Sequence, residues 1–328
     1  MDAEAAVVAE RFGRFARDEA PGRSELYAAW ARLVESDLDL QRTLAAIPAN
    51  RRQPPLVFAV TRLLGAPDAP DTDAVAWGDW VLAHADEVAR ECACRSLQTN
   101  EPQRCAALLP ALSRIPGPIA LLEIGASAGL CLYPDRYSYR YSGAAGEVRL
   151  DPADGPSEVV LDCTVRGERM PQVTMPEVVW RAGIDLAPLD PAAPGTVDWL
   201  TRLVWPGESG REERIRAALR IAASDQPVLV AGDGAQLLAS VAARAPKGAT
   251  LVVQTPGVLA HIPWAGRHAV IAAARAAGRW ITLDAPSLHE GWSVSVDAAD
   301  WPGGFALALD GDVLAAADPL GAWLQLAS

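Results

Sequence analysis

The amino-acid sequence predicts an α/β protein, in which an α-helical N-terminal domain precedes a mostly parallel sheet. Three observations support this prediction. Residues 1–116 carry apolar side chains at helical spacing. From residue 118, short apolar runs alternate with alanine-rich segments, which is typical of strands and helices that build a parallel sheet. Between the two parts, Pro116-Gly117-Pro118 interrupts the chain and predicts a domain boundary.

Length and composition limit the functions that are open to the chain. Its 328 residues are enough for about two domains whose cores need no metal or disulfide. The net charge is −12 and Lys247 is the single lysine, so we expect no nucleic-acid partner, which clustered lysines and arginines would bind. The acidic N-terminus lacks the features of a secretory signal, and no apolar run reaches membrane-spanning length. We therefore expect a cytoplasmic protein with no membrane partner.

The N-terminal domain, residues 1–116, is expected to consist of helices. Ser24 follows Pro21-Gly22 and is a favourable N-cap for the segment that runs to residue 47. The tryptophans at helical spacing, Trp77 among them, are best explained as the core between packed helices. The expected helical segments are 3–20, 24–47, 54–65, 73–88 and 101–115.

The second domain, residues 117–328, is expected to hold the sheet. Asp310-Gly311 is a hairpin signal in the C-terminal tail, so an antiparallel edge should close the sheet. Residues 134–176 carry tyrosines at every second position and then glycine-rich turns, which indicates a β-rich insertion. The expected strands are 119–123, 178–184, 227–231, 249–254, 279–283, 292–296 and 305–309, and the expected helices are 196–205, 209–223, 234–245 and 266–277.

The candidate functional region begins at residues 119–130, where a buried strand ends in Glu123 and a glycine-rich turn. Gly125 and Gly129 permit positive φ and let a ligand approach the backbone. We expect a helix to open after the turn, with free N–H groups that favour an electron-rich ligand. The segment therefore predicts a nucleotide-like pocket.

Other polar residues follow the neighbouring strands. Ligands of open parallel sheets bind at the carboxyl ends of the strands, near the point where the strand order reverses. Asp185 could hold both hydroxyls of a ribose. Asp151 is the alternative, because Asp151 lies closer to the glycine turn along the chain. Asp233 could accept a hydrogen bond from an adenine amine. The residues expected to contact the ligand are Glu123, Gly125, Ala126, Ser127, Gly129, Asp185, Gly232, Asp233 and Thr255.

Two resemblances follow from these motifs. Glu123 to Gly129 and Arg181 to Pro188 resemble the first two motifs of class I S-adenosylmethionine-dependent methyltransferases. The likeness covers about residues 118–310 and implies a Rossmann-like methyltransferase sheet, S-adenosylmethionine as cofactor and methyl transfer to a small molecule or a protein side chain. The whole chain is also similar to an uncharacterised bacterial family, domain of unknown function 2332, which implies no activity. The segments that carry this second likeness are 98–101, 104–110, the glycine turn, 137–141, 181–189 and 203–206.

The methyltransferase resemblance implies roles for single residues. Glu123, Gly125, Ser127 and Gly129 would line the methionine end of the cofactor. Asp185 would hold its ribose, and Gly232 and Asp233 would lie at its adenine. A base is needed only if the methyl acceptor must lose a proton, and the candidates are Glu101, His261 and Tyr137. The candidate substrate contacts are Asn100, Arg104 and Tyr139.

Residues 98–102 also have a purely structural explanation, in which Thr99 or Asn100 caps the next helix and Glu101 lies in its first turn. Because that helix leads into the central strand, its N-terminus could instead lie over the pocket.

Two other functions stay open. Gly125 to Gly129 also reads G-x-S-x-G, the pattern of a serine hydrolase in which Ser127 would be the nucleophile. Asp233 and one of His261, His268 or His289 would then complete a catalytic triad. The second alternative is a non-catalytic nucleotide-binding or interaction module. No metal is expected, since neither the histidines nor the five cysteines have ligand spacing.

Overall fold

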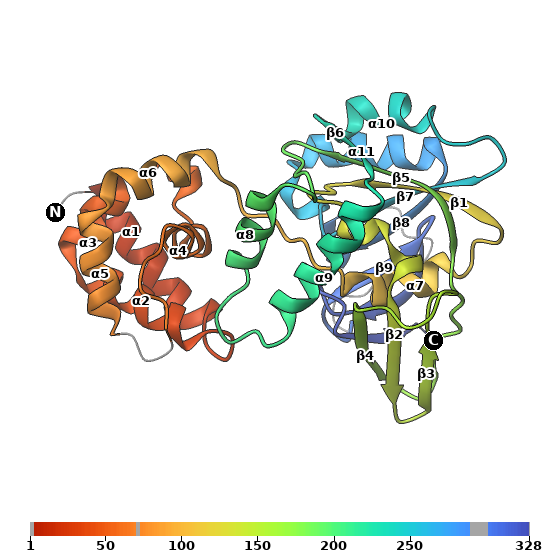
Figure 1. Cartoon of the computed structure of the whole chain (residues 1–328), viewed down its shortest axis with the longest axis horizontal. Helices are drawn as coiled ribbons and strands as arrows, with labels where there is room; N and C mark the ends of the chain where they lie inside the picture. The colour runs from red at the N-terminus through yellow and green to blue at the C-terminus, as the bar shows by residue number, and fades with distance from the viewer. Residues whose placement is uncertain (1–2, 70–72, 289–300, 328) are drawn as a thin grey trace. The chain divides into compact units, whose positions relative to one another are not determined.

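A computed structural model describes residues 3–69, 73–288 and 301–327 of the chain, which divides into two compact units (Figure 1). The first unit contains Met1–Thr99 and Pro194–Glu213, and the second contains Asn100–Ala193 and Arg214–Ser328. Residues 100–116, which the sequence groups with the N-terminal helices, belong to the second unit because their helix packs against the strands of the sheet.

The first unit is helical, as expected from its apolar spacing. Ser24 caps α2 through a hydrogen bond from the Tyr27 N–H to its Oγ, at 3.3 Å. Asp37 has an extended backbone and accepts the N–H groups of Asp39 and Leu40, so the expected segment 24–47 forms two helices. The helices are α1 (Ala3–Arg14), α2 (Glu25–Ser36), α3 (Leu38–Ala45), α4 (Pro54–Leu63), α5 (Ala74–Ala83), α6 (Ala85–Cys94) and α8 (Pro194–Arg202).

Aromatic side chains form the core of this unit. Trp30 and Trp77 are fully buried and stack with their ring centroids 4.8 Å apart. Phe58 contacts both rings edge-on. Tyr27 contacts Phe58 and also Trp205, which belongs to the segment that returns to this unit after residue 193. The interpretation of the tryptophan stripe as core is confirmed for Trp77.

The second unit is built on a mixed, mostly parallel sheet of eleven described strands. Their order is β3-β2-β4-β11-β10-β9-β8-β7-β1-β5-β6. The strands are β1 (Pro118–Ile124), β2 (Ser138–Gly143), β3 (Gly146–Leu150), β4 (Val160–Arg166), β5 (Glu177–Asp185), β6 (Val228–Ala231), β7 (Thr250–Pro256), β8 (Arg279–Asp284), β9 (Phe305–Leu309), β10 (Asp312–Ala317) and β11 (Trp323–Leu326).

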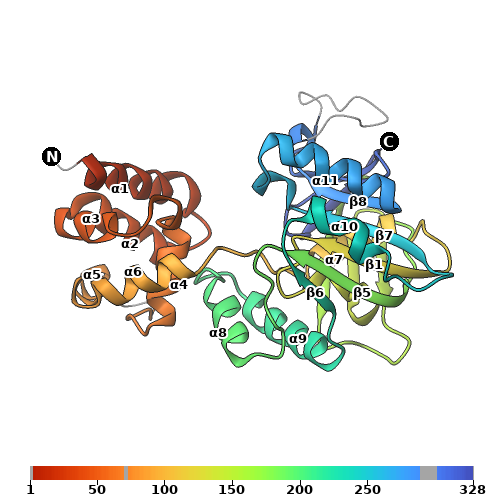
Figure 2. The same ribbon diagram turned by 90° about the horizontal axis from the view of Figure 1, so that it is seen from above.

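Helices lie on opposite faces of this sheet (Figure 2). On one face, α10 (Gly234–Ala242) and α11 (Trp264–Ala277) pack together and contact β5, β7 and β8. On the other, α7 (Arg104–Leu112) is in contact with β4, β8, β9 and β10, and every one of its residues is buried. The remaining helix of this part of the chain is α9 (Arg211–Ser224). Complete burial of α7 explains its composition, which is apolar except for Arg104 at its start.

The C-terminal hairpin forms where Asp310-Gly311 predicts it. Both residues have positive φ, 56° and 98°, as a two-residue type I′ turn requires. The expectation that these antiparallel strands form the edge of the sheet is wrong, because β11 pairs in parallel with β4 and the sheet continues into the insertion. The insertion is β-rich as expected, with β2, β3 and β4 inside 134–176. The expected strand 292–296 lies outside the described residues.

Candidate functional site

The carboxyl ends of four neighbouring parallel strands, β7, β1, β5 and β6, meet at one edge of the sheet. From β1 the chain moves outward to β5 and β6 and then returns to β7 on the other side of β1, so the strand order reverses between β1 and β7. Such a reversal is where open α/β sheets bind their ligands. The glycine turn predicted from the sequence lies at this point.

Hydrogen bonds to other residues of the protein hold the glycine turn in place. Gly125, Ser127 and Gly129 all have positive φ, of 78°, 50° and 75°. All five N–H groups from residue 125 to residue 129 donate to protein oxygens: Ile184 O accepts two, and Asp185 Oδ2, Asn100 Oδ1 and Ala126 O accept one each. The turn therefore offers no set of free N–H groups to a ligand, and a Cβ on Gly125 would meet the side chain of Val258 at 2.5 Å.

The helix expected after the turn is absent, and this prediction is wrong. Residues 130–132 and 134–136 form single 3-10 turns, and the chain then enters β2. Gly129 has a left-handed conformation at the position where a helix would have to start. Pro134 then removes a backbone donor four residues after Leu130. A helix dipole directed at the turn from this segment is therefore not part of the site.

Asp185 and Asn100 position the turn from two sides. The two carboxylate oxygens of Asp185 accept the N–H groups of Ser127 and Ala187, both at 2.8 Å. The side chain of Asn100 accepts the Ala128 N–H at 3.0 Å and donates to Ser127 Oγ. Asn100 is thus tied to the turn through the turn's backbone and its serine.

The turn lies beside the end of β6. The N–H of Gly232 donates to Asp185 O at 2.8 Å. Asp233 follows as the N-cap of α10, where its Oδ1 accepts the Gln236 N–H at 3.1 Å. Asp233 is exposed, and Gly125, Asp185 and Gly232 are half-buried, so these four residues face solvent at one edge. We call Gly125, Asp185, Gly232 and Asp233 the rim.

A second group of polar residues lies near the carboxyl ends of β1, β7 and β8, but these residues are buried. Glu123, Gln254 and Asp284 end these strands and are at most 4% exposed. Gln254 Nε2 donates to Glu123 Oε2 at 3.2 Å and to Cys131 O at 3.0 Å. Arg104 stands at the start of α7 and donates to Pro256 O at 3.0 Å and Pro319 O at 2.9 Å. We call Arg104, Glu123, Gln254 and Asp284 the buried polar cluster.

Burial changes the protonation of this cluster. It raises the pKa of Asp284 to about 8, although the positive charge of Arg104 opposes the change. It also raises the pKa of Glu123 well above its ordinary value, against the hydrogen bond from Gln254. Within the described residues, Asp284 Oδ1 and Gln254 Oε1 are buried and accept no hydrogen bond. The cluster is thus a set of buried oxygens with two carboxyl groups that hold their protons unusually tightly.

The other predicted residues lie in the protein interior or on separate segments. Tyr137 and Tyr139 are fully buried, and their hydroxyls donate to the carbonyls of Leu130 and Pro134 at 2.7 and 2.5 Å. Burial raises the pKa of both hydroxyls, away from the range of a general base at neutral pH. Thr255 is buried and accepts the indole N–H of Trp280 at 3.1 Å.

The remaining base candidates differ in their accessibility. Glu101 is 1% exposed and its Oε1 accepts from the Gln103 N–H and from Arg214 Nε, at 3.0 and 2.9 Å. His261 is exposed in the segment that follows β7. Asp151, the alternative ribose acid, follows β3 at the far end of the strand order and pairs with Arg140. The structure thus brings Asp185, and not Asp151, to the glycine turn.

Sequence reasoning did not single out Asp284. The signal was present, since Asp284 directly follows the apolar run 279–283 just as Glu123 ends the first strand. What the sequence lacks is the pairing of β8 beside β7, which brings Asp284 next to Arg104.

Comparison with known proteins adds one finding. The model of a bacterial family described as "uncharacterized protein conserved in bacteria", domain of unknown function 2332, matches residues 9–325. The chain belongs to this family. The match spans both compact units of the chain. No curated protein and no solved structure matches the chain.

Two segments that carry the family likeness hold the surroundings of the turn. Asn100 binds the turn directly. Arg181, on β5, makes a two-pronged ion pair with Asp135 at 2.9 and 2.7 Å and also donates to Leu132 O. These contacts fix the segment that replaces the expected helix.

In the part of the chain that the structure describes, no three His, Cys, Asp or Glu side chains group as a metal site would. None of the described helices has the length and apolar character that crossing a bilayer requires.

Proposed function

We propose that this family member binds S-adenosylmethionine at the rim and transfers its methyl group to a small molecule or a protein side chain. The observation that carries the proposal is the reversal of strand order beside β1, with the glycine turn, Asp185 and Asp233 gathered at that reversal. The sequence resemblance to class I methyltransferases points to the same residues.

The rim residues suit the cofactor. Each oxygen of Asp185 accepts one N–H group, and a carboxylate has about four acceptor positions, so two remain for the hydroxyls of a ribose. Asp233 uses Oδ1 for its cap and is exposed, which leaves Oδ2 for an amine donor. Gly125 is half-buried beside these acids, and its positive φ of 78° allows the tight turn that places Asp185 against the Ser127 N–H.

The cofactor would supply an activated methyl group, and the protein would contribute orientation. Positioning of two reactants accounts for much of the acceleration in such a displacement. Asn100 and Asp185 hold the turn rigidly through hydrogen bonds to consecutive N–H groups, which suits that task. If the acceptor must lose a proton, His261 is the exposed candidate for the base near the end of β7.

Calorimetric titration of S-adenosylmethionine and S-adenosylhomocysteine into the full chain tests the proposal. We expect a dissociation constant of about 1 to 100 μM, within the range that calorimetry resolves. Asp185→Asn should abolish binding, because one oxygen that meets the turn and the ribose becomes an amide. Asp233→Ser should weaken binding about tenfold, since serine caps a helix as well as aspartate does but is too short to reach the ligand.

Asp73→Ser is the matched control. Asp73 is also an N-cap, of α5 in the helical unit, where its carboxylate accepts the Val75 N–H. This variant should bind as the wild type does. Wild-type protein that binds neither compound at millimolar concentration would remove the methyltransferase proposal. Binding without turnover on a broad panel of acceptors would instead favour a non-catalytic nucleotide-binding module.

A second candidate function, serine hydrolysis, draws support from one observation. Ser127 has φ of 50°, the strained backbone expected of a nucleophile on a sharp turn after a strand. His261 and His268 are exposed in the segment after β7, whereas His289 lies outside the described residues. A fluorophosphonate probe that labels the wild type but not Ser127→Ala would support this function, and an unlabelled wild type would exclude it.

A further inference from the structure

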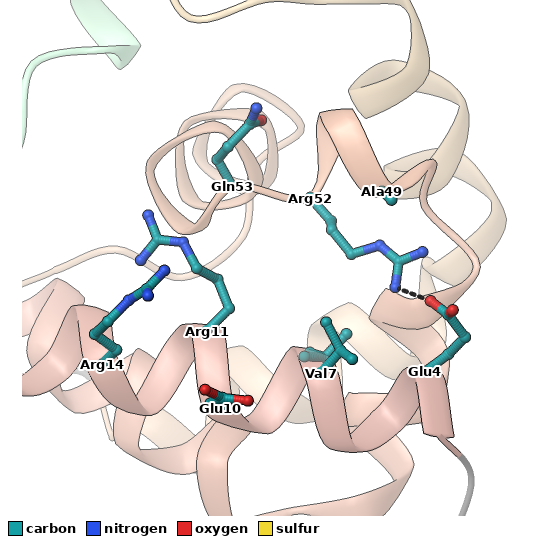
Figure 3. Close-up of a pocket in the computed structure, with 9 residues that line it drawn as sticks. Glu4, Val7, Glu10, Arg11, Arg14, Ala49, Arg52 and Gln53 are labelled. Carbon is teal, nitrogen blue, oxygen red and sulfur yellow. Dashed lines mark hydrogen bonds and ion pairs between the residues drawn. The ribbon is translucent and has the colours of Figure 1, made fainter.

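The helical unit contains a pocket of about 440 Å³ between α1 and the segment that leads into α4 (Figure 3). Three arginines line it, Arg11 and Arg14 from α1 and Arg52 from the opposite wall. Its volume is within the range of small-molecule sites, which combine apolar walls with a few converging polar groups. The pocket lies wholly within the first unit, so it is separate from the rim and from the buried polar cluster.

The three arginines differ in how far their charge is satisfied. Arg52 donates to Glu4 at 2.7 Å and to Ile47 O at 2.9 Å, and its side chain is only 12% exposed. Arg11 uses one nitrogen for Glu19, at 2.6 Å. The side chain of Arg14 forms no hydrogen bond or ion pair within the described residues. One complete guanidinium group and part of a second are therefore open to a ligand.

Neither acidic side chain of the pocket pairs with Arg14 in the part of the chain that the structure describes. Glu4 is already paired with Arg52. Glu10 also lines the pocket, four residues before Arg14, yet in the described structure it makes no ion pair. Arg11 and Arg14 are three residues apart, a spacing at which like charges on a helix repel each other. An anion that contacts both guanidinium groups would relieve that repulsion.

Apolar groups complete the pocket. Val7, Val8 and Ala49 lie among its lining residues, and Val7 is 55% exposed although it is a large apolar side chain. Arg11 and Arg14 extend from α1 toward the wall that carries Gln53, and Val7 extends from the same helix (Figure 3). A ligand with an anionic head and a short apolar group would meet both kinds of surface.

We propose that this pocket binds a small organic anion, whose phosphate or carboxylate lies against Arg14 and Arg11 and whose apolar part lies against Val7. A guanidinium group makes two parallel hydrogen bonds to either head group. The proposal is independent of methyl transfer and gives the helical unit a binding function of its own.

Calorimetry with phenyl phosphate, benzoate and inorganic phosphate tests the proposal on the full chain. We expect phenyl phosphate or benzoate to bind, and Arg14→Gln to weaken that binding by about tenfold. The binding should also weaken as salt rises, because it rests on partly exposed charges. The better of the two organic probes identifies the head group. Val7→Thr should weaken the organic probes but leave inorganic phosphate unchanged.

Arg42→Gln is the matched control, since Arg42 is an exposed arginine of α3 in the same unit and does not line the pocket. It should change the dissociation constant by less than about twofold. Thermal melting of each variant checks that the unit stays folded. An equal loss of binding in Arg42→Gln and Arg14→Gln would overturn the proposal in favour of a diffuse charge effect. A wild type that binds none of the probes at about 10 mM would overturn it outright.

Discussion

The rim and the buried polar cluster lie at the same edge of one sheet, yet their acids are in opposite situations. Asp185 and Asp233 reach solvent and accept one backbone N–H group at each oxygen they use. Glu123 and Asp284 are buried, and their burial raises the pKa of both. Position at a carboxyl end therefore does not determine what an acid does. Solvent access decides whether it can meet a ligand or must keep its proton.

The two groups of acids differ in solvent access because different elements flank the strands on which they lie. Beyond β7 the sheet continues into β8, β9 and β10, and α7 packs against those strands with Arg104 at its start. Beyond β1 the sheet ends after β5 and β6, so the ends of those strands stay open. Four substitutions test this comparison, from the largest expected effect to the smallest.

Arg104→Met should cause the largest loss of stability. It removes the positive charge that opposes proton uptake by Glu123 and Asp284, and it leaves the carbonyls of Pro256 and Pro319 without their donor. We expect a loss of about 2–5 kcal/mol, measured by denaturant unfolding, because each buried carbonyl that loses its donor costs about 1–3 kcal/mol. Arg104→Lys, which keeps the charge but not the fork of donors, should lose less. A loss below about 1 kcal/mol in Arg104→Met would show that the two carbonyls do not need Arg104 as their donor.

Asn100→Ala should destabilise the protein by about 1–3 kcal/mol. The buried N–H of Ala128 would lose its acceptor, and the hydroxyl of Ser127 would lose the donor that Asn100 provides. Asn100→Asp keeps the acceptor for Ala128 and should recover part of the loss. If alanine and aspartate were equally harmful, the bond to Ala128 would not be what holds the turn.

Asp284→Asn should change how stability depends on pH. The pKa of this carboxyl group is about 3.9 in an unfolded chain, and burial raises the pKa to about 8 in the folded protein. Between these values the folded state binds more protons, so the free energy of unfolding falls as the pH rises. The variant has no such group, and the wild type should lose stability relative to it from about pH 5 to pH 8. If the wild type and Asp284→Asn differed by the same free energy of unfolding at pH 5, 6.5 and 8, Asp284 would not be a buried, protonated group.

Asp233→Ser should have the smallest effect on stability, below about 0.5 kcal/mol, because serine and aspartate are comparable N-caps. Its thermal midpoint should stay close to that of the wild type, whereas its affinity for S-adenosylmethionine should fall. A large loss of stability would mean that the fold depends on Asp233 and that this part of the rim is not free to bind a ligand.

Much of the fold could be predicted because local patterns agree with it. The apolar runs 119–123 and 279–283 became β1 and β8, and the expected helix 266–277 became α11. Asp310-Gly311 predicted its hairpin because positive φ at two adjacent positions suits very few residues. The helix after the glycine turn was wrongly expected, because Leu130 and Cys131 are compatible with a helix, whereas Gly129 before them is left-handed and Pro134 follows them.

The sequence by itself determined the two-part α/β organisation, the glycine turn and the acids at the strand ends. Periodicity and turn chemistry act over a few residues, so they can be read without a structure. Only the tertiary structure decided that β11 joins β4, that Asp185 and not Asp151 meets the turn, and that Asp284 is buried beside Arg104. Each of these depends on residues that are far apart in the chain, and their pairing is set by packing and not by local preference.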